Sequence, residues 1–164
     1  TDLHVIMETN EALENIYDIT QASKRTVALY FGGVDMAAEL RVDNKWENLL
    51  YARSKLVHAG ASAGIDVIDV PYLDLENMDG MKKEAELVRN LGFTGKGSIH
   101  PKQIKILNEV FTPPEDEIIK AKKILEQFNN SNTGLVVIDG KLIEKPVLRE
   151  MQRKILIADK INKI

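Results

Sequence analysis

TVALYFGGVDM, residues 26–36, is the stretch that decides the fold: an apolar run that ends at two glycines and is followed by an acid, Asp35. A similar run, residues 3–7 of the stretch LHVIMETN (3–10), precedes it and is followed by Glu8. If both runs are parallel strands joined by a helix, both carboxylates emerge at the same carboxyl edge of a sheet, where α/β proteins carry their chemistry. The two acids could then share one divalent metal ion.

Short apolar runs alternate with helical patterns over the first two thirds of the chain. Strands are predicted at residues 3–7, 26–31 and 67–70, with a weaker fourth at residues 97–99. Helical spacing predicts helices over residues 10–19, with Asn10 as cap, and over about 46–63, 81–91 and 104–110. Four β-α units in a row predict an α/β fold with a parallel sheet and right-handed crossovers.

The pattern changes after Phe111. Pro113-Pro114 ends one element and can begin a helix whose apolar residues lie over 118–128. A hairpin of residues 135–138 and 141–143 around Asp139-Gly140 follows, and then a last helix over 146–161. We predict two domains, residues 1–111 and a separate appendage of residues 112–164.

Composition excludes several classes of function. The chain has 164 residues, 44% hydrophobic and 29% charged, with a net charge of -3 and no cysteine. No basic face is predicted, so a nucleic-acid partner and an anionic membrane surface are excluded, and a small molecule or a protein is favoured. Without a membrane span or a secretory signal, the chain is predicted to be cytoplasmic.

Five stretches together resemble a known family. They are IMETNEALENI (6–16), LYFGGVDMAAEL (29–40), YARSKLVHAGASAGIDVIDV (51–70), LGFTGKGSIHPKQI (91–104) and VIDGKLIEKPVL (137–148). In this order they resemble the citrate lyase β-subunit group of (β/α)8 TIM-barrel enzymes, in the HpcH/HpaI aldolase/citrate lyase superfamily. The group includes citryl-, malyl- and citramalyl-thioester lyases.

The resemblance covers only the carboxyl-terminal half of such a barrel and its C-terminal lid. It implies that the N-terminal half barrel, which carries substrate-binding arginines, is a missing partner, so that the chain is a truncated fragment or one subunit of a split barrel. A half barrel leaves two strand edges unpaired, which is an aggregation liability. The resemblance also implies a homo-oligomer.

The resemblance implies that Glu8 and Asp35 are ligands of Mg²⁺, an ion that prefers oxygen donors and is often held by one or two carboxylates. The alternatives are that Glu8 caps the next helix or pairs with a lysine and that Asp35 is a helix-start acid. Related enzymes bind a substrate carboxylate at the backbone that matches Gly33, Val34 and Asp35. A strand-to-helix turn without a ligand is the alternative there.

A third acid, Glu144, matches the place where relatives carry a catalytic aspartate that moves a proton at the acetyl methyl carbon. An exposed acid beside Lys145 is the alternative. The resemblance implies a Mg²⁺-dependent carbon–carbon lyase that cleaves a citryl, malyl or citramalyl thioester of coenzyme A or an acyl-carrier protein to a 2-oxo acid such as oxaloacetate and an acetyl thioester. A 2-oxo acid aldolase without a thioester and a non-catalytic scaffold or binding subunit are the alternatives.

Four other polar residues receive smaller predictions. Arg53, inside a helix, is predicted to pair with an acid of its own sheet or of the missing half. Lys96 is either a contact of a coenzyme A phosphate or solvated. Asp69 either borders the pocket mouth or belongs to a turn, and His100 is predicted to make a structural hydrogen bond.

Overall fold

A computed structural model describes residues 1–131, 136–138, 141–143 and 145–161. The chain divides into two compact units, Thr1–Phe111 and Thr112–Ile164. The first unit is an α/β layer structure, and the second consists of two helices and a hairpin.

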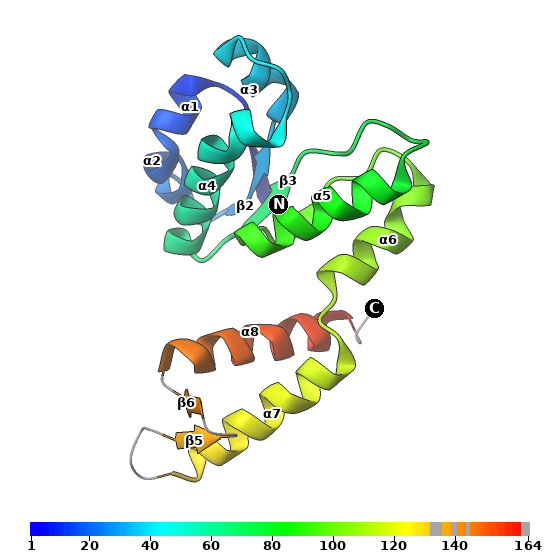
Figure 1. Ribbon diagram of the computed structural model, residues 1–164. Helices are drawn as coiled ribbons and strands as arrows, with labels where there is room; N and C mark the ends of the chain where they lie inside the picture. Colours follow the sequence, from blue (N-terminus) through cyan, green and yellow to red (C-terminus); the bar gives the residue numbers. More distant parts are fainter. Residues whose placement is uncertain (132–135, 139–140, 144, 162–164) are drawn as a thin grey trace. The chain divides into compact units, whose positions relative to one another are not determined.

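The first unit contains a four-stranded sheet in the order β1-β2-β3-β4, with every neighbouring pair parallel. This confirms the predicted α/β fold with a parallel sheet. The strands are β1 (Leu3–Met7), β2 (Thr26–Phe31), β3 (Asp66–Asp69) and β4 (Gly95–Lys96). The helices of this unit, seen in Figure 1, are α1 (Asn10–Glu14), α2 (Ile16–Gln21), α3 (Gly33–Leu40), α4 (Trp46–Ala63), α5 (Met78–Leu91) and α6 (Pro101–Phe111).

Helices cover one face of the sheet. Helix α4 packs across β2 and β3, with α2 beside it, and its predicted apolar stripe is buried: Leu49, Ala52, Leu56 and Ala59. These side chains share one core cluster with Leu29 and Val67, which lie in one register row of the sheet. The neighbouring row, Ile6–Tyr30–Ile68, points to the opposite face because strand side chains alternate. Ile6 is 57% exposed there.

The fourth strand was predicted too late in the chain. It lies at Gly95–Lys96 instead of residues 97–99. The buried Gln103 side chain is the reason, because its Oε1 accepts hydrogen bonds from the Ile99 amide at 3.0 Å and the Ser98 hydroxyl at 3.2 Å. These bonds hold residues 98–99 in the turn that leads into α6. The third strand starts and ends one residue earlier than predicted.

One helix prediction was also wrong, and one helix was missed. The single helix over residues 10–19 is divided at Asn15 into α1 and α2, and its cap is Thr9, whose Oγ1 accepts from the Ala12 amide at 3.1 Å, not Asn10. Helix α3 was not predicted. Its eight residues follow two glycines, and a segment so short gives little periodicity.

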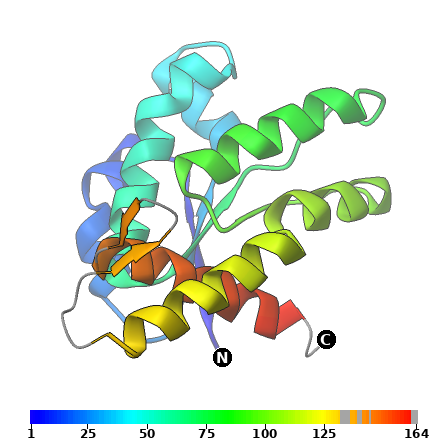
Figure 2. The same cartoon turned by 60° about the horizontal axis from the view of Figure 1, so that its bottom comes forward.

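The second unit is held by its own small core. Helices α7 (Glu115–Asn129) and α8 (Lys145–Ile161) lie side by side, as Figures 1 and 2 show. The predicted hairpin is confirmed as antiparallel β5 (Val136–Ile138) and β6 (Lys141–Ile143), while its turn lies outside the described residues. The buried side chains of this core are Ile124, Ile138, Ile143 and Leu148.

An ion pair also connects the two helices of the second unit. Lys154 Nζ lies 2.7 Å from Glu117 Oε2, and this hydrogen bond raises the pKa of Lys154. No helix in the described part of the chain is both long and apolar enough to cross a membrane.

Candidate metal centre

Glu8 lies directly after β1, at the carboxyl edge of the sheet. The neighbouring strand ends at the same level, because Met7 is paired with Phe31 and the Gly32 amide donates to the Met7 carbonyl at 3.0 Å. The Glu8 side chain is half-buried. Within residues 1–131 and the described parts of the tail, its carboxylate takes part in no ion pair. Since Thr9 caps α1, neither structural alternative for Glu8 is supported.

Gly32 leaves the space that the Glu8 side chain fills. A Cβ on Gly32 would lie 2.4 Å from Glu8 Cβ and 2.9 Å from Glu8 Oε2, closer than packed atoms come. Only a residue without a side chain therefore fits at position 32, and the space above Gly32, the cradle, holds the Glu8 side chain. The carboxylate is held against the turn that begins α3 without being neutralised by a base.

We expect Gly32→Ala to displace Glu8 and weaken any metal site that Glu8 builds. Overpacking of this kind costs about 1–3 kcal/mol of stability, and the metal affinity should fall as well. Gly95→Ala is the matched control, since its Cβ would lie 3.9 Å from Ile68 Cγ1, an ordinary contact. Isothermal titration and chemical denaturation of both variants check this, and equal metal affinity in both would contradict it.

Gly33, Val34 and Asp35 form the first turn of α3. Gly33 is buried, whereas Val34 and Asp35 are exposed. The segment is a strand-to-helix turn, and Asp35 is an acid of the first helical turn, where the helix dipole favours it. The turn begins beside the end of β1, since the Gly32 amide donates to the Met7 carbonyl, so its place in the fold is compatible both with a ligand site and with a turn that binds no ligand. The roles of these residues stay predictions.

The remaining predicted site residue is not described. Glu144 lies outside the described residues, so its role as a proton-transfer residue stays a prediction. Among the residues that are described, no group of three or more His, Asp or Glu side chains could hold a metal ion. Glu8 and Asp35 would thus be the protein's only contribution from this part of the chain, with water and substrate oxygens completing the shell.

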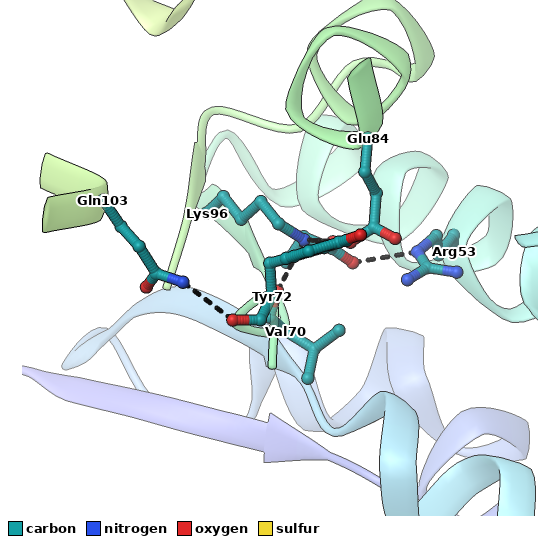
Figure 3. Close-up of polar contacts among 7 residues, drawn as sticks. Arg53, Val70, Tyr72, Glu84, Lys96 and Gln103 are labelled. Atoms are coloured by element: carbon teal, nitrogen blue, oxygen red, sulfur yellow. Dashed lines mark hydrogen bonds and ion pairs between the residues drawn. The ribbon is translucent and has the colours of Figure 1, made fainter. Parts of the chain in front are cut away.

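A buried charge cluster lies at the ends of the next two strands (Figure 3). Asp69, the last residue of β3, is fully buried and accepts from Arg53 Nε at 2.9 Å and from Lys96 Nζ at 2.6 Å. Lys96 Nζ also donates to the Val70 carbonyl and to Glu84 Oε1, both at 2.7 Å. Each charge in the cluster is thus paired, as burial requires.

Arg53 is sandwiched between two aromatic rings. Its Cζ lies 5.0 Å from the centre of the Phe31 ring and 4.8 Å from that of Trp46. Arg53 Nη1 is buried without a hydrogen-bond partner among the described residues, and the cation–π contacts compensate part of its desolvation. The predicted pairing of Arg53 with an acid of its own sheet is confirmed.

Lys96 was interpreted wrongly, because its ammonium group is neither solvated nor available to a phosphate: the side chain is 0% exposed. Only one pair of the cluster had a signal in the sequence. Arg53 interrupts the apolar stripe of its helix and Asp69 lies in the next strand, so these two opposite charges can meet beneath the helix layer. Lys96 gave no such signal, because the fourth strand was predicted to begin after it. His100 makes the predicted structural bond, its Nδ1 accepting from the Lys102 amide at 3.1 Å.

Two tyrosines lie around this cluster. Burial, and after it the charge of Asp69, raises the pKa of the Tyr30 hydroxyl. Burial raises the pKa of Tyr72 too, with Glu84 and Asp74 adding to the effect. Both hydroxyls therefore stay protonated through the neutral range and can act as hydrogen-bond donors.

A parallel sheet with acids at its carboxyl edge defines an α/β protein with a candidate metal site. The family model for HpcH/HpaI aldolase/citrate lyase matches residues 1–101, and the chain belongs to this family.

Named relatives are lyases or their subunits. The citrate lyase subunit beta of Haemophilus influenzae is 34% identical over 148 residues, which are 84% of this chain and 51% of that protein. The mitochondrial citramalyl-CoA lyase of Rattus norvegicus is 33% identical over 140 residues, 82% of this chain and 41% of that protein. The chain thus spans about half the length of the curated relatives it matches.

Solved structures agree on the fold. RipC from Yersinia pestis is 38% identical with a TM-score of 0.71, over 72% of this chain and 55% of that one. The CitE protein of Mycobacterium tuberculosis, solved with magnesium, acetoacetate and coenzyme A, is 23% identical with a TM-score of 0.80, over 96% of this chain and 61% of that one. The second likeness shows the fold alone.

Proposed function

We propose that this chain is the carboxyl-terminal half of a magnesium-dependent carbon–carbon lyase that cleaves a citryl, malyl or citramalyl thioester. The products are a 2-oxo acid, oxaloacetate for the citryl substrate, and an acetyl thioester. Relatives named citrate lyase subunit beta and citramalyl-CoA lyase support the reaction class. A citrate lyase beta subunit from M. tuberculosis, 25% identical and solved with oxaloacetate and magnesium, supports the cofactor, and the citramalyl-CoA lyase relatives support coenzyme A as the thioester carrier.

One observation carries this proposal: the Glu8 carboxylate is packed over Gly32 with no base beside it in the described part of the chain, at the edge where the turn of Asp35 begins. A half-buried carboxylate is costly unless something compensates its charge. A hard divalent cation bound by both Glu8 and Asp35 would compensate the charge of the Glu8 carboxylate, because such cations prefer oxygen ligands. The residues present therefore fit magnesium.

The reaction needs few groups from this chain. When bound, magnesium would stabilise the negative charge that develops on the substrate's hydroxyl oxygen. The N–H groups of Gly33, Val34 and Asp35 would orient the substrate carboxylate. The hydroxyl proton passes to water, the hydroxyl carbon becomes the carbonyl of the 2-oxo acid, and the electron pair of the broken carbon–carbon bond forms the enolate of the acetyl thioester. A proton added to the enolate carbon then makes the methyl group. Glu144 would deliver that proton, one methylene longer than the aspartate of the relatives.

The uncovered row of the sheet supports the half-barrel architecture. Ile6, Tyr30 and Ile68 lie in register on the face opposite the helices, and Ile6 is largely exposed. Completion by an N-terminal half would bury this row as the interior of a closed barrel, where side chains fill the centre. The unpaired edges of β1 and β4 would then pair with strands of that half.

Titration separates this proposal from its alternatives. We expect heat on titrating the chain with Mg²⁺ in the presence of oxaloacetate, and Mg²⁺-dependent release of oxaloacetate from citryl-coenzyme A once the N-terminal half of a relative is added. Malyl- and citramalyl-coenzyme A are the substrate controls. A free 2-oxo acid aldolase would cleave substrates without a thioester, and a scaffold would give no metal-dependent heat. Either result would overturn the proposal.

A further inference from the structure

Two arms of the buried charge cluster reach the start of α3. The first arm runs through Phe31, whose ring stacks on Arg53 and whose Cε1 lies 3.0 Å from the place a Cβ on Gly33 would occupy. The second arm runs through Val70. Its carbonyl accepts from Lys96 at 2.7 Å, and its Cγ1 lies 3.1 Å from the same place above Gly33.

Asp69 joins the two arms. Its Oδ1 holds Arg53 and its Oδ2 holds Lys96, and all three side chains are 3% exposed or less. The side chains of Phe31 and Val70 both lie within 3.1 Å of the place that a Cβ on Gly33 would occupy. Gly33 is the first residue of the helix that carries Asp35 two positions later. A displacement of either arm would therefore open space at this turn.

We propose that Asp69, Arg53 and Lys96 are positioning residues that set the direction of the first turn of α3, and with it the Asp35 carboxylate. The inference rests on the proposed metal site. Stability alone does not explain the cluster, because well-packed apolar residues in place of buried ions are often neutral or stabilising. Supporting partners of a metal ligand, by contrast, fix its orientation and strengthen binding.

Two variants loosen the turn in different ways. Val70→Ala removes the contact above Gly33 and buries no charge, and Lys96→Met removes the bond to the Val70 carbonyl. Glu84→Gln is the matched control, because it neutralises the partly exposed partner of Lys96, 29% exposed at its side chain, and leaves the Val70 bond in place. All three are made in the full chain.

Amide hydrogen exchange and Mn²⁺ affinity, followed by the electron-spin signal of free Mn²⁺, are the readouts. The Met36 amide donates to the Gly32 carbonyl at 3.0 Å and reports the first turn of α3, while the Leu56 amide in α4 reports unfolding of the whole unit. In Val70→Ala and Lys96→Met we expect Met36 to exchange faster relative to Leu56, and Mn²⁺ to bind about tenfold more weakly, as for other supporting partners. Glu84→Gln should match the wild type in both.

Unchanged Met36 exchange in Val70→Ala and Lys96→Met would overturn the inference, as would Mn²⁺ affinity equal to that of the wild type. If the wild-type chain does not bind Mn²⁺, the proposed metal site is wrong. Met36 exchange then decides alone whether the cluster positions the turn, so the two failures are distinguished.

Discussion

Glu8→Gln and Asp35→Asn, each made alone, are expected to lower the Mg²⁺ affinity of the chain by more than about 100-fold, since even outer-shell partners of metal ligands contribute 10–100-fold. Both substitutions keep the size of the side chain and remove the charge. A neutral amide oxygen is a weaker donor for a hard cation than a carboxylate. Gln at position 8 also still fills the cradle over Gly32, so packing is retained.

The measurement is isothermal titration with Mg²⁺ and oxaloacetate. Glu14→Gln is the control, because Glu14 is 83% exposed at its side chain and pairs only at 3.3 Å with Lys55. It removes the same charge from the same unit. If either site variant binds Mg²⁺ as tightly as the Glu14 variant, that residue is not a ligand. With the N-terminal half added, thioester cleavage should fall in parallel.

The sheet was predictable because its strands are bounded by abrupt changes in the sequence. Gly32-Gly33 ends β2, and short segments rich in apolar residues recur at intervals that suit β-α units. Glu8 was placed correctly at the carboxyl edge for the same reason. The fourth strand was predicted at residues 97–99, too late in the chain, because its end is set by the side-chain oxygen of Gln103, a contact made from the following helix.

The charge cluster was not predictable as a whole, because it joins side chains that are distant in the chain. The sequence predicted that Arg53 pairs with an acid of its own sheet. It did not predict that Lys96 binds the same carboxylate, that of Asp69, from 27 residues away in the chain. The burial of Lys96 follows from the packing of α5 over β4. From the sequence alone, a lysine at this position is expected to be solvated. Long-range packing overrides the composition of the segment.

The largest effect on stability is expected for Asp69→Ala. The substitution removes the carboxylate that Arg53 and Lys96 share and leaves their two charges buried. Breaking a buried ion pair by removing one partner costs about 3–5 kcal/mol. The free energy of unfolding should fall by this amount, which for a domain of this size corresponds to about 10 °C or more in the unfolding midpoint. Trp46 is the single tryptophan and stacks on Arg53, so its fluorescence follows unfolding of this unit directly.

Asp43→Ala is the control for that loss. Asp43 pairs with Lys45 at 2.8 Å, but the two side chains are 74% and 66% exposed, so its removal should cost less than about 1 kcal/mol. Adding Lys96→Met to Asp69→Ala should cost less than the sum of the single changes, because the buried ammonium group that loses its Asp69 partner in the first change is then absent. Additive losses, or an Asp69 variant as stable as the Asp43 variant, would show that the buried charges do not act as one unit.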